Sequence, residues 1–185
     1  MAPTKCTESA ARASYAGAWG YASGVTLHIF GFVARAGTGA VLAAPPGSAF
    51  VPLLAGWSFA PLRSRELGVP VARPVSGFDE LSEASYVWAL DACGRGPLAF
   101  VEAEYFGGTG AQSAAVFEAG SMVLGPLRSE TTWDGSVFAA PPAHERAINV
   151  ALRRLGVAAS AGLDEFDTVG LGRHRSNDGF RTSQR

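Results

Sequence analysis

The segment 98–124 (LAFVEAEYFGGTGAQSAAVFEAGSMVL) constrains the fold of this chain more than any other part of the sequence. It contains three runs rich in strand-forming residues, 98–106, 111–117 and 122–124, separated by short segments with turn chemistry. Connections this short join antiparallel neighbours. The segment therefore predicts a β-meander of three strands.

A helix is predicted on each side of this meander. Residues 77–93 have apolar side chains at helical spacing, an approximate capping box that begins at Ser76, and Gly94 as a stop signal. Residues 143–155 follow two prolines, carry an apolar stripe and end at Gly156. Together with the meander, these helices predict a single α+β domain built on an antiparallel sheet.

The first half of the chain is apolar and rich in β-forming residues. Residues 25–34 predict a strand, a turn at 37–39 follows, and 40–44 are expected to return as a short paired strand. Residues 49–62 are apolar but interrupted by proline and glycine, which predicts an edge strand or irregular packed structure.

Two segments of the second half show no regular pattern. Residues 125–142 are polar and end in two prolines, so a loop is expected there. The tail from Gly162 is densely charged and loop-like. Its apolar residues nevertheless predict that it docks on the domain; they are Phe166, Val169 and Leu171.

Length and composition indicate one folded domain. The chain has 185 residues, of which 48% are apolar and 17% charged, so it can bury a core and is not generally disordered. The expected organisation is a flexible lead at 1–13, a domain at 14–180 and a disordered end at 181–185. Within the domain, 14–75 form a β-rich apolar half, and 76–180 form a half made of helix, meander, helix and tail.

Charge, cysteine content and the N-terminal sequence narrow the class of protein. The net charge of −1 provides no general attraction for nucleic acid, and two cysteines do not make a disulfide framework. Residues 13–34 lack charge but contain too many glycine and polar residues for a membrane span. Lys5 and Glu8 do not form the basic start of a secretory signal. The cytoplasm is therefore the expected location, with neither membrane nor nucleic acid as partner.

Glu102 and Glu104 are the first candidates for chemistry. They are two residues apart in a strand, so they share one face with Phe100 and Phe106 and lie about 6 to 7 Å apart. Because apolar surroundings disfavour a charged carboxylate, the pair is expected either to meet arginines or to open onto a cleft. A plain solvent-facing strand is an equally open alternative. Such a pair can support metal-ion or acid/base chemistry.

The charged tail supplies the second set of candidates. It contains Asp164, Glu165 and Asp167, followed by Arg173, His174 and Arg175. The glycines between these two groups allow the backbone to bend and bring them side by side. Three interpretations stay open: a salt-bridge clasp, a carboxylate site shared with the strand glutamates in which the histidine is a ligand or base, and a protein-binding surface.

Recognised catalytic and cofactor motifs are absent from the sequence. The glycine-rich segment 107–110 joins two predicted strands, whereas phosphate loops join a strand to a helix, so a hairpin turn is expected. No nucleophile elbow, His-Glu-x-x-His or Cys-x-x-Cys motif occurs. His28 lies in an apolar strand and is interpreted as a core histidine. No cofactor and no bound metal are predicted.

Three motifs resemble a family of small uncharacterised bacterial proteins: FVEAEYFGGTGAQSAAVF, ALRRLGV and DEFDTVGLGRHRSND. The resemblance covers about 98–180, and some members of the family look like immunity proteins of polymorphic toxins. The positions that match the family pattern are Glu102, Glu104, Tyr105, Phe106, Gly107, Gly108, Gln112, Asp164, Glu165, Asp167, Arg173, His174 and Arg175. The expected binding residues are these positions without Phe106, Gly107 and Gly108.

Three functional hypotheses follow. The leading hypothesis is a cytoplasmic binding protein without catalysis, an immunity-type inhibitor of a toxin enzyme, whose acidic strand face covers a basic cleft of that partner. The second is a metal-assisted hydrolase that uses Glu102, Glu104, Asp167 and His174. The third is a subunit of a larger assembly with 40–62 in its interface. The oligomeric state is left open.

Overall fold

The computed structural model describes residues 26–63 and 74–182, and the predicted lead at 1–13 lies outside them. In these residues an antiparallel sheet of seven strands has the order β2-β3-β1-β4-β5-β6-β7. The strands are β1 (Leu27–Arg35), β2 (Val51–Pro52), β3 (Trp57–Pro61), β4 (Leu98–Phe106), β5 (Thr109–Glu118), β6 (Ser121–Trp133) and β7 (Phe138–Ala139). The helices are α1 (Ala36–Val41), α2 (Glu83–Ala92), α3 (Ala147–Arg154), α4 (Glu165–Val169) and α5 (Asn177–Thr182), with the 3-10 turns η1 (Cys93–Arg95), η2 (Ala143–Glu145) and η3 (Leu171–Arg173).

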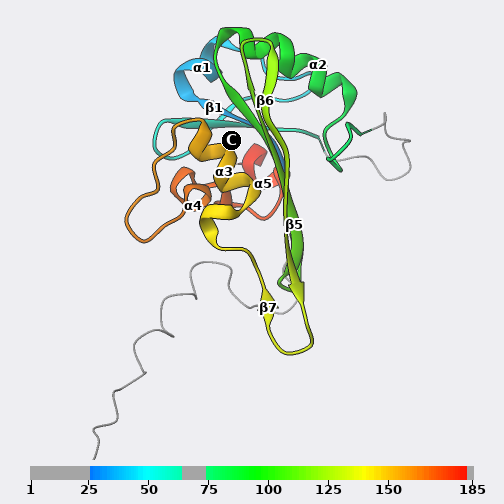
Figure 1. Ribbon diagram of the computed structural model, residues 1–185. Coiled ribbons are helices and arrows are strands. Elements are labelled where there is room, and N and C mark those ends of the chain that lie inside the picture. Colours follow the sequence, from blue (N-terminus) through cyan, green and yellow to red (C-terminus); the bar gives the residue numbers. More distant parts are fainter. Residues whose placement is uncertain (1–25, 64–73, 183–185) are drawn as a thin grey trace, which may run out of the picture.

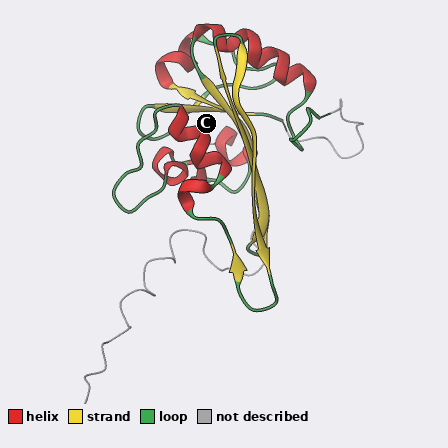
Figure 2. Ribbon diagram, in the orientation of Figure 1, coloured by secondary structure: helices red, strands yellow, loops and turns green. Residues whose placement is uncertain are grey.

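These elements form layers with the sheet in the middle (Figure 1, Figure 2). α2 packs on one face of the sheet, and α3, α4 and α5 pack on the other. Strand side chains alternate between the two cores, because Phe32 and Phe100 point toward α2 whereas Val33 and Val101 point toward α3. This arrangement confirms the predicted single-domain α+β fold with an antiparallel sheet.

The predicted meander is present in full. β4, β5 and β6 are consecutive neighbours in the sheet, and β4 has the predicted bounds 98–106. Gly107 and Gly108 form the turn between β4 and β5, with φ angles of 59° and 91°. Two consecutive residues with positive φ match the twist of an antiparallel hairpin and favour glycine. The glycine-rich segment is therefore a hairpin turn, as expected.

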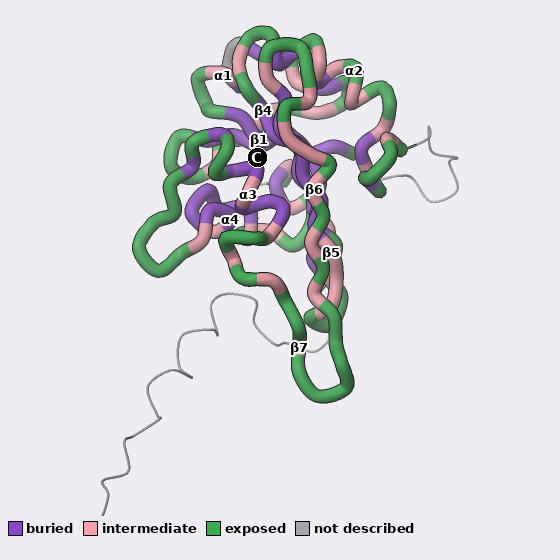
Figure 3. The backbone as a smooth tube through the Cα atoms, viewed as in Figure 1, coloured by how far each residue is buried: buried purple, intermediate pink, exposed green. Residues whose placement is uncertain are grey.

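β6 is much longer than the sequence suggested. The prediction of a polar loop over 125–142 is wrong, because β6 continues to Trp133 and β7 pairs with its last two residues. None of the residues of β6 is buried, so the strand lacks the apolar pattern that usually reveals one. The β5–β6 hairpin extends beyond the helices and carries β7 at its far end (Figure 1). Burial decreases along this hairpin toward β7 (Figure 3).

Both predicted helices begin later than expected. α2 begins at Glu83 instead of residue 77, and its N-cap is Ser82, whose hydroxyl accepts the Ser85 N–H. α3 begins at Ala147, because the extended backbone of Arg146 separates it from η2. The apolar stripe predicted for α3 is buried as expected; it consists of Ala147, Ile148, Ala151, Leu152 and Leu155.

The first half of the domain supplies β1, β2 and β3. The prediction of a return strand at 40–44 is wrong, because α1 occupies 36–41. The segment 49–62 contains β2 and β3, and β2 is the outermost strand, which confirms the expected edge position. Large apolar side chains of this segment are buried in the protein's own core, namely Val51, Trp57, Phe59 and Leu62. These four side chains therefore stabilise the fold.

The charged tail docks on the domain, as its apolar anchors predicted, but it is not a loop. Phe166, Val169 and Leu171 are all buried, and the tail folds into α4, η3 and α5. The side chain of Asp164 caps α4, and Gly170, with φ of 82°, ends it. Helices this short carry little periodic signal. α5 extends to Thr182, two residues beyond the predicted domain end at 180, and 183–185 lie outside the described residues.

Asn177 joins this tail to the sheet. β3 does not reach the first half of β1, and the tail occupies that position instead. The His28 N–H donates to the carbonyl of Arg175 at 2.9 Å. Asn177, which is 1% exposed, accepts the Phe30 N–H at 3.0 Å. Its amide nitrogen donates to the carbonyls of Phe30 and Leu62, both at 2.7 Å. One side chain thus replaces a strand neighbour for β1.

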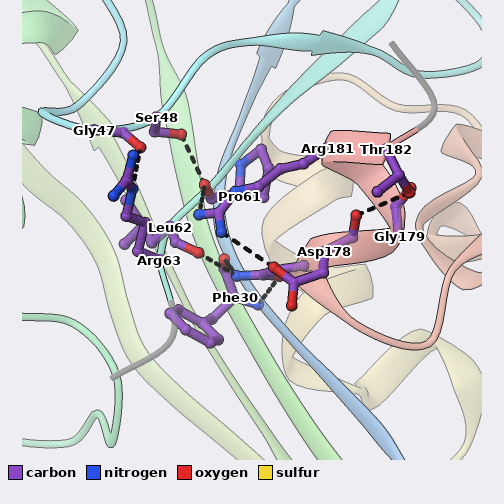
Figure 4. Close-up of polar contacts among 11 residues, drawn as sticks. Phe30, Gly47, Ser48, Pro61, Leu62, Arg63, Asp178, Gly179, Arg181 and Thr182 are labelled. Atoms are coloured by element: carbon purple, nitrogen blue, oxygen red, sulfur yellow. Dashed lines mark hydrogen bonds and ion pairs between the residues drawn. The ribbon is translucent and has the colours of Figure 1, made fainter. Parts of the chain in front are cut away.

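α5 adds contacts to the same corner of the sheet (Figure 4). Arg181 donates to the carbonyl of Pro61 at 3.2 Å and pairs with Asp178 at 3.2 Å. The hydroxyl of Ser48 donates to the same carbonyl at 2.7 Å. The end of β3 is therefore held by donors from two other segments.

We expect Asn177→Ala to lower the free energy of unfolding by about 2 to 4 kcal/mol, because it leaves the buried N–H of Phe30 without its partner and removes the donor that Asn177 supplies to the carbonyls of Phe30 and Leu62. The matched control is Asp178→Ala at the neighbouring, exposed position, where removal of a surface ion pair changes stability by less than about 1 kcal/mol. Urea unfolding of the three proteins measures both values. Equal stability of the two variants would contradict the role given to Asn177.

Candidate functional site

An open groove of about 420 Å³ lies on the α2 face of the sheet. Its floor comes from β4, β5 and β6, and its wall comes from β1 and from the loop before α2. The lining residues are His28, Asp79, Glu80, Glu102, Ala103, Glu104, Phe106, Thr109, Gly110, Ala111, Ser113, Arg128, Glu130, Thr131 and Thr132. This groove contains the strand glutamates that the sequence singled out.

Strand register assembles the floor of the groove. Glu104 is paired with Ala111 of β5, and Ala111 is paired with Glu130 of β6. The two glutamates are therefore two strands apart, with about 9 to 10 Å between their backbones and the small side chain of Ala111 between them. Phe106 shares the face of Glu104 and is 66% exposed. The floor thus offers two carboxylates and an exposed aromatic ring to a ligand.

Glu102 supports the wall of the groove. It is 6% exposed, and its two carboxylate oxygens accept the backbone N–H groups of Asp79 at 3.0 Å and Glu80 at 2.9 Å. Burial raises the pKa of this carboxyl, although the hydrogen bonds from the two backbone N–H groups oppose the shift. Glu102 therefore positions the loop and is not the freely exposed acid that one of the sequence interpretations required.

His28 lies in the part of the wall that β1 supplies. Its Nε2 is 3.4 Å from the carboxylate of Glu80, and its side chain is 33% exposed. The hydrogen bond with Glu80 raises the pKa of His28, burial opposes this, and the charges of Glu80, Glu104 and Glu102 add to the rise. The interpretation of His28 as a core histidine is wrong, because this residue lies at the start of β1, where its side chain lines the groove and is partly exposed.

The groove carries an excess of negative charge. Five acidic residues line it, together with Arg128 and His28. Arg128 is already engaged by Asp79 at 3.2 Å and by Glu130 at 2.9 Å, and these hydrogen bonds raise its pKa. Glu104 is exposed and acts on His28 through its charge. The arrangement therefore favours a cationic ligand.

Two acids of the tail form a salt-bridge clasp, but with α3 and the residue that precedes it. Glu165 lies 2.8 Å from Arg153, and Asp164 lies 3.7 Å from Arg146. The backbone carbonyl of Arg175 accepts the N–H of His28 in β1, as described above. The clasp is therefore formed between the tail and α3 rather than within the tail.

Gln112 and Tyr105 lie on the α3 face of the sheet. The side-chain oxygen of Gln112 accepts the N–H of Ile148 at 3.4 Å and so helps to satisfy the start of α3. Burial raises the pKa of Tyr105, whereas side-chain hydrogen bonds with Thr131 and Gln112 oppose the rise. These two predicted binding residues support α3 rather than line the groove.

The sheet also separates the tail from the strand glutamates. The ring of His174 packs 4.6 Å from Phe180, which belongs to the core on the α3 side, and Arg173 lies in η3 on the same tail. Burial and the charge of Asp164 raise the pKa of Asp167 in α4. The four residues of the hydrolase hypothesis therefore do not converge. In residues 26–63 and 74–182, no group of three His, Cys, Asp or Glu side chains is arranged to hold a metal ion.

Sequence reasoning found Glu102 and Glu104 but missed their neighbours. Arg128 and Glu130 alternate along β6, a signal that the segment assigned to a loop did contain. Asp79 was taken for the first turn of a helix, and nothing local indicated that its backbone meets a strand. Those partners come together through tertiary contacts alone.

Comparison with protein-family models, curated proteins and solved structures finds no match to this chain. Among the described helices, none combines the length and apolar character needed to cross a membrane.

We expect Glu102→Gln to lower the free energy of unfolding by about 1 to 3 kcal/mol, because the new amide NH₂ faces a backbone N–H in place of an accepting oxygen. Glu104→Gln, two residues along the same strand face, is the matched control and changes stability by less than about 0.5 kcal/mol. Thermal or urea unfolding measures both. Similar losses for the two variants would contradict the supporting role of Glu102.

A second prediction concerns pH. Because Glu80 raises the pKa of His28 in the folded protein, this pair contributes stability that is fully present below the unfolded pKa of 6.5 and is lost as the pH rises through the folded pKa. Glu80→Gln should therefore destabilise the protein more near pH ~6 than near pH ~9. The control is Glu145→Gln, beside the exposed His144, for which we expect no such dependence. Unfolding at several pH values measures it, and a penalty independent of pH would refute the assignment.

Proposed function

We propose that the protein is a cytoplasmic binding protein without catalysis, an immunity-type inhibitor whose acidic groove covers a basic cleft of a toxin enzyme. The observation that carries the proposal is the charge of the groove. Its five acidic residues face one arginine and one histidine, and that arginine is already paired within the groove. A surface of this kind attracts and orients a basic partner.

The floor suggests how a basic side chain is held. A lysine or arginine that enters between Glu104 and Glu130 has a carboxylate on each side and the small Ala111 beneath it. The apolar stem of such a side chain can lie along the exposed ring of Phe106. An arginine can in addition make paired hydrogen bonds with a carboxylate. This geometry supports recognition of a cationic residue of a partner protein.

Protection of cells tests the proposal. Each toxin candidate encoded beside this protein is expressed with the wild type, and we expect one candidate to be neutralised and to bind the protein in isolation. Glu104→Lys should weaken that binding at least about tenfold, because it places a like charge beside the basic partner. Glu104 is suitable for this test because it is exposed and supports no backbone contact of the loop.

The matched control is Asp91→Lys, which makes the same change of charge at an exposed position of α2 outside the groove. This variant should bind and protect like the wild type. Binding should also weaken as salt is added, because exposed charges are screened. If the wild type neither binds nor neutralises any neighbouring gene product, or if both variants lose binding equally, the proposed function is wrong.

A further inference from the structure

The outer edge of β6 is open along most of its length. On one side β6 pairs with β5 from Ser121 to Thr131, whereas on the other side β7 pairs only with Thr132 and Trp133. Within the described part of the chain, 121–131 thus has a strand neighbour on one side alone. An open edge presents unpaired backbone groups that can accept another strand.

The edge has a defined usable length. Pro126 has no N–H to offer, and the β5–β6 pairing is irregular near this point. β7 occupies the outer side beyond Thr131. Five residues, 127–131, remain between these two limits. In this window Arg128 and Glu130 point to the groove face, and the residues that alternate with them point to the α3 face.

Resting on the function proposed above, we infer that the basic partner binds as an extended segment that adds a strand to β6 at 127–131 and extends a basic side chain over the groove. The added strand would lie about 4.8 Å from β6, so a lysine or arginine opposite Glu130 reaches its carboxylate. A basic residue opposite Arg128 would be repelled, which defines the register of the segment.

A short segment fits this edge better than a second copy of the whole strand. A symmetric antiparallel pair of two β6 strands centred on Ser129 would match Arg128 with Glu130, but it would place the Pro126 of the second copy beside Thr132. Ala139 of β7 already pairs with Thr132. A partner segment that ends at this point avoids the collision. The charges of the groove and the position of β7 therefore both favour an extended piece of another protein.

The test uses the full chain and a defined probe, the five-residue peptide Thr-Arg-Thr-Thr-Thr with blocked ends, which in the antiparallel register places its arginine opposite Glu130 and a threonine opposite Arg128. Hydrogen exchange of the chain with and without the peptide should show new protection of amides within 127–131. Only every second N–H of an added strand faces β6. N-methylation of the residues whose N–H groups face β6 should weaken binding at least about tenfold, whereas N-methylation of the residues between them should have little effect. Because only the peptide is altered, the fold of the protein is the same in every measurement.

Three outcomes overturn the inference. They are a peptide that does not bind, equal binding of both methylated peptides without protection of 127–131, and light scattering that shows a dimer protected at 127–131 without peptide. In the second case, loss of peptide binding in Glu104→Lys would leave the acidic groove as the binding site and remove only the added strand. The proposed function itself is tested separately, by the experiment in which the protein protects cells from toxin candidates.

Discussion

The groove depends on the hydrogen bonds of Glu102 with the loop before α2. Both oxygens of this buried carboxylate accept backbone N–H groups, and such charge-assisted bonds offset the cost of removing the charge from water. The loop is thereby fixed across the sheet. From this position Asp79 reaches Arg128 of β6, and Glu80 reaches His28 of β1. Glu102 thus positions the two loop acids, Asp79 and Glu80, that pair with Arg128 and His28.

The same loop explains why the groove is open. Helical spacing would allow α2 to begin near residue 77, but Gly77 has a φ of 91°, which a right-handed helix excludes, and its backbone packs against Pro126. Ser82 caps α2 one and a half turns later. A longer α2 would lack the loop that binds Glu102. Because α2 begins only at Glu83, the residues before it form a wall of the groove instead of additional helical turns.

The predictable parts of the fold are those whose information is local. β4 matched residue for residue, because its alternation of side chains is bounded by a glycine pair that requires positive φ. The predicted strand at 122–124 lies in β6, but the continuation of β6 to Trp133 was missed because its residues are not buried and lack the apolar pattern of a core strand. α4 and α5 were missed because helices of five and six residues are held by caps and tertiary contacts rather than by their own periodicity.

In the candidate site, too, the features that could be predicted are those set by local sequence. Strand alternation placed Glu102 and Glu104 on one face, and the structure keeps them there. Their different roles could not be predicted, because only the loop buries Glu102 and leaves Glu104 exposed. The interpretation in which the tail joins them in a carboxylate site, one of the three left open, was wrong for a related reason. Apolar anchors show that a segment docks, but they do not show on which face of a sheet it docks.

β1 connects the two regions that the sequence marked as interesting. The backbone N–H of His28 donates to the tail, while its side chain meets Glu80 in the groove. Two residues further along, Asn177 of the tail bonds to both backbone groups of Phe30. The tail therefore holds the segment of β1 that carries the groove histidine, although it packs on the opposite face. The tail that contains the Arg-His-Arg motif therefore supports, through β1, a wall of the groove that the acidic strand lines. The tail itself does not line the groove.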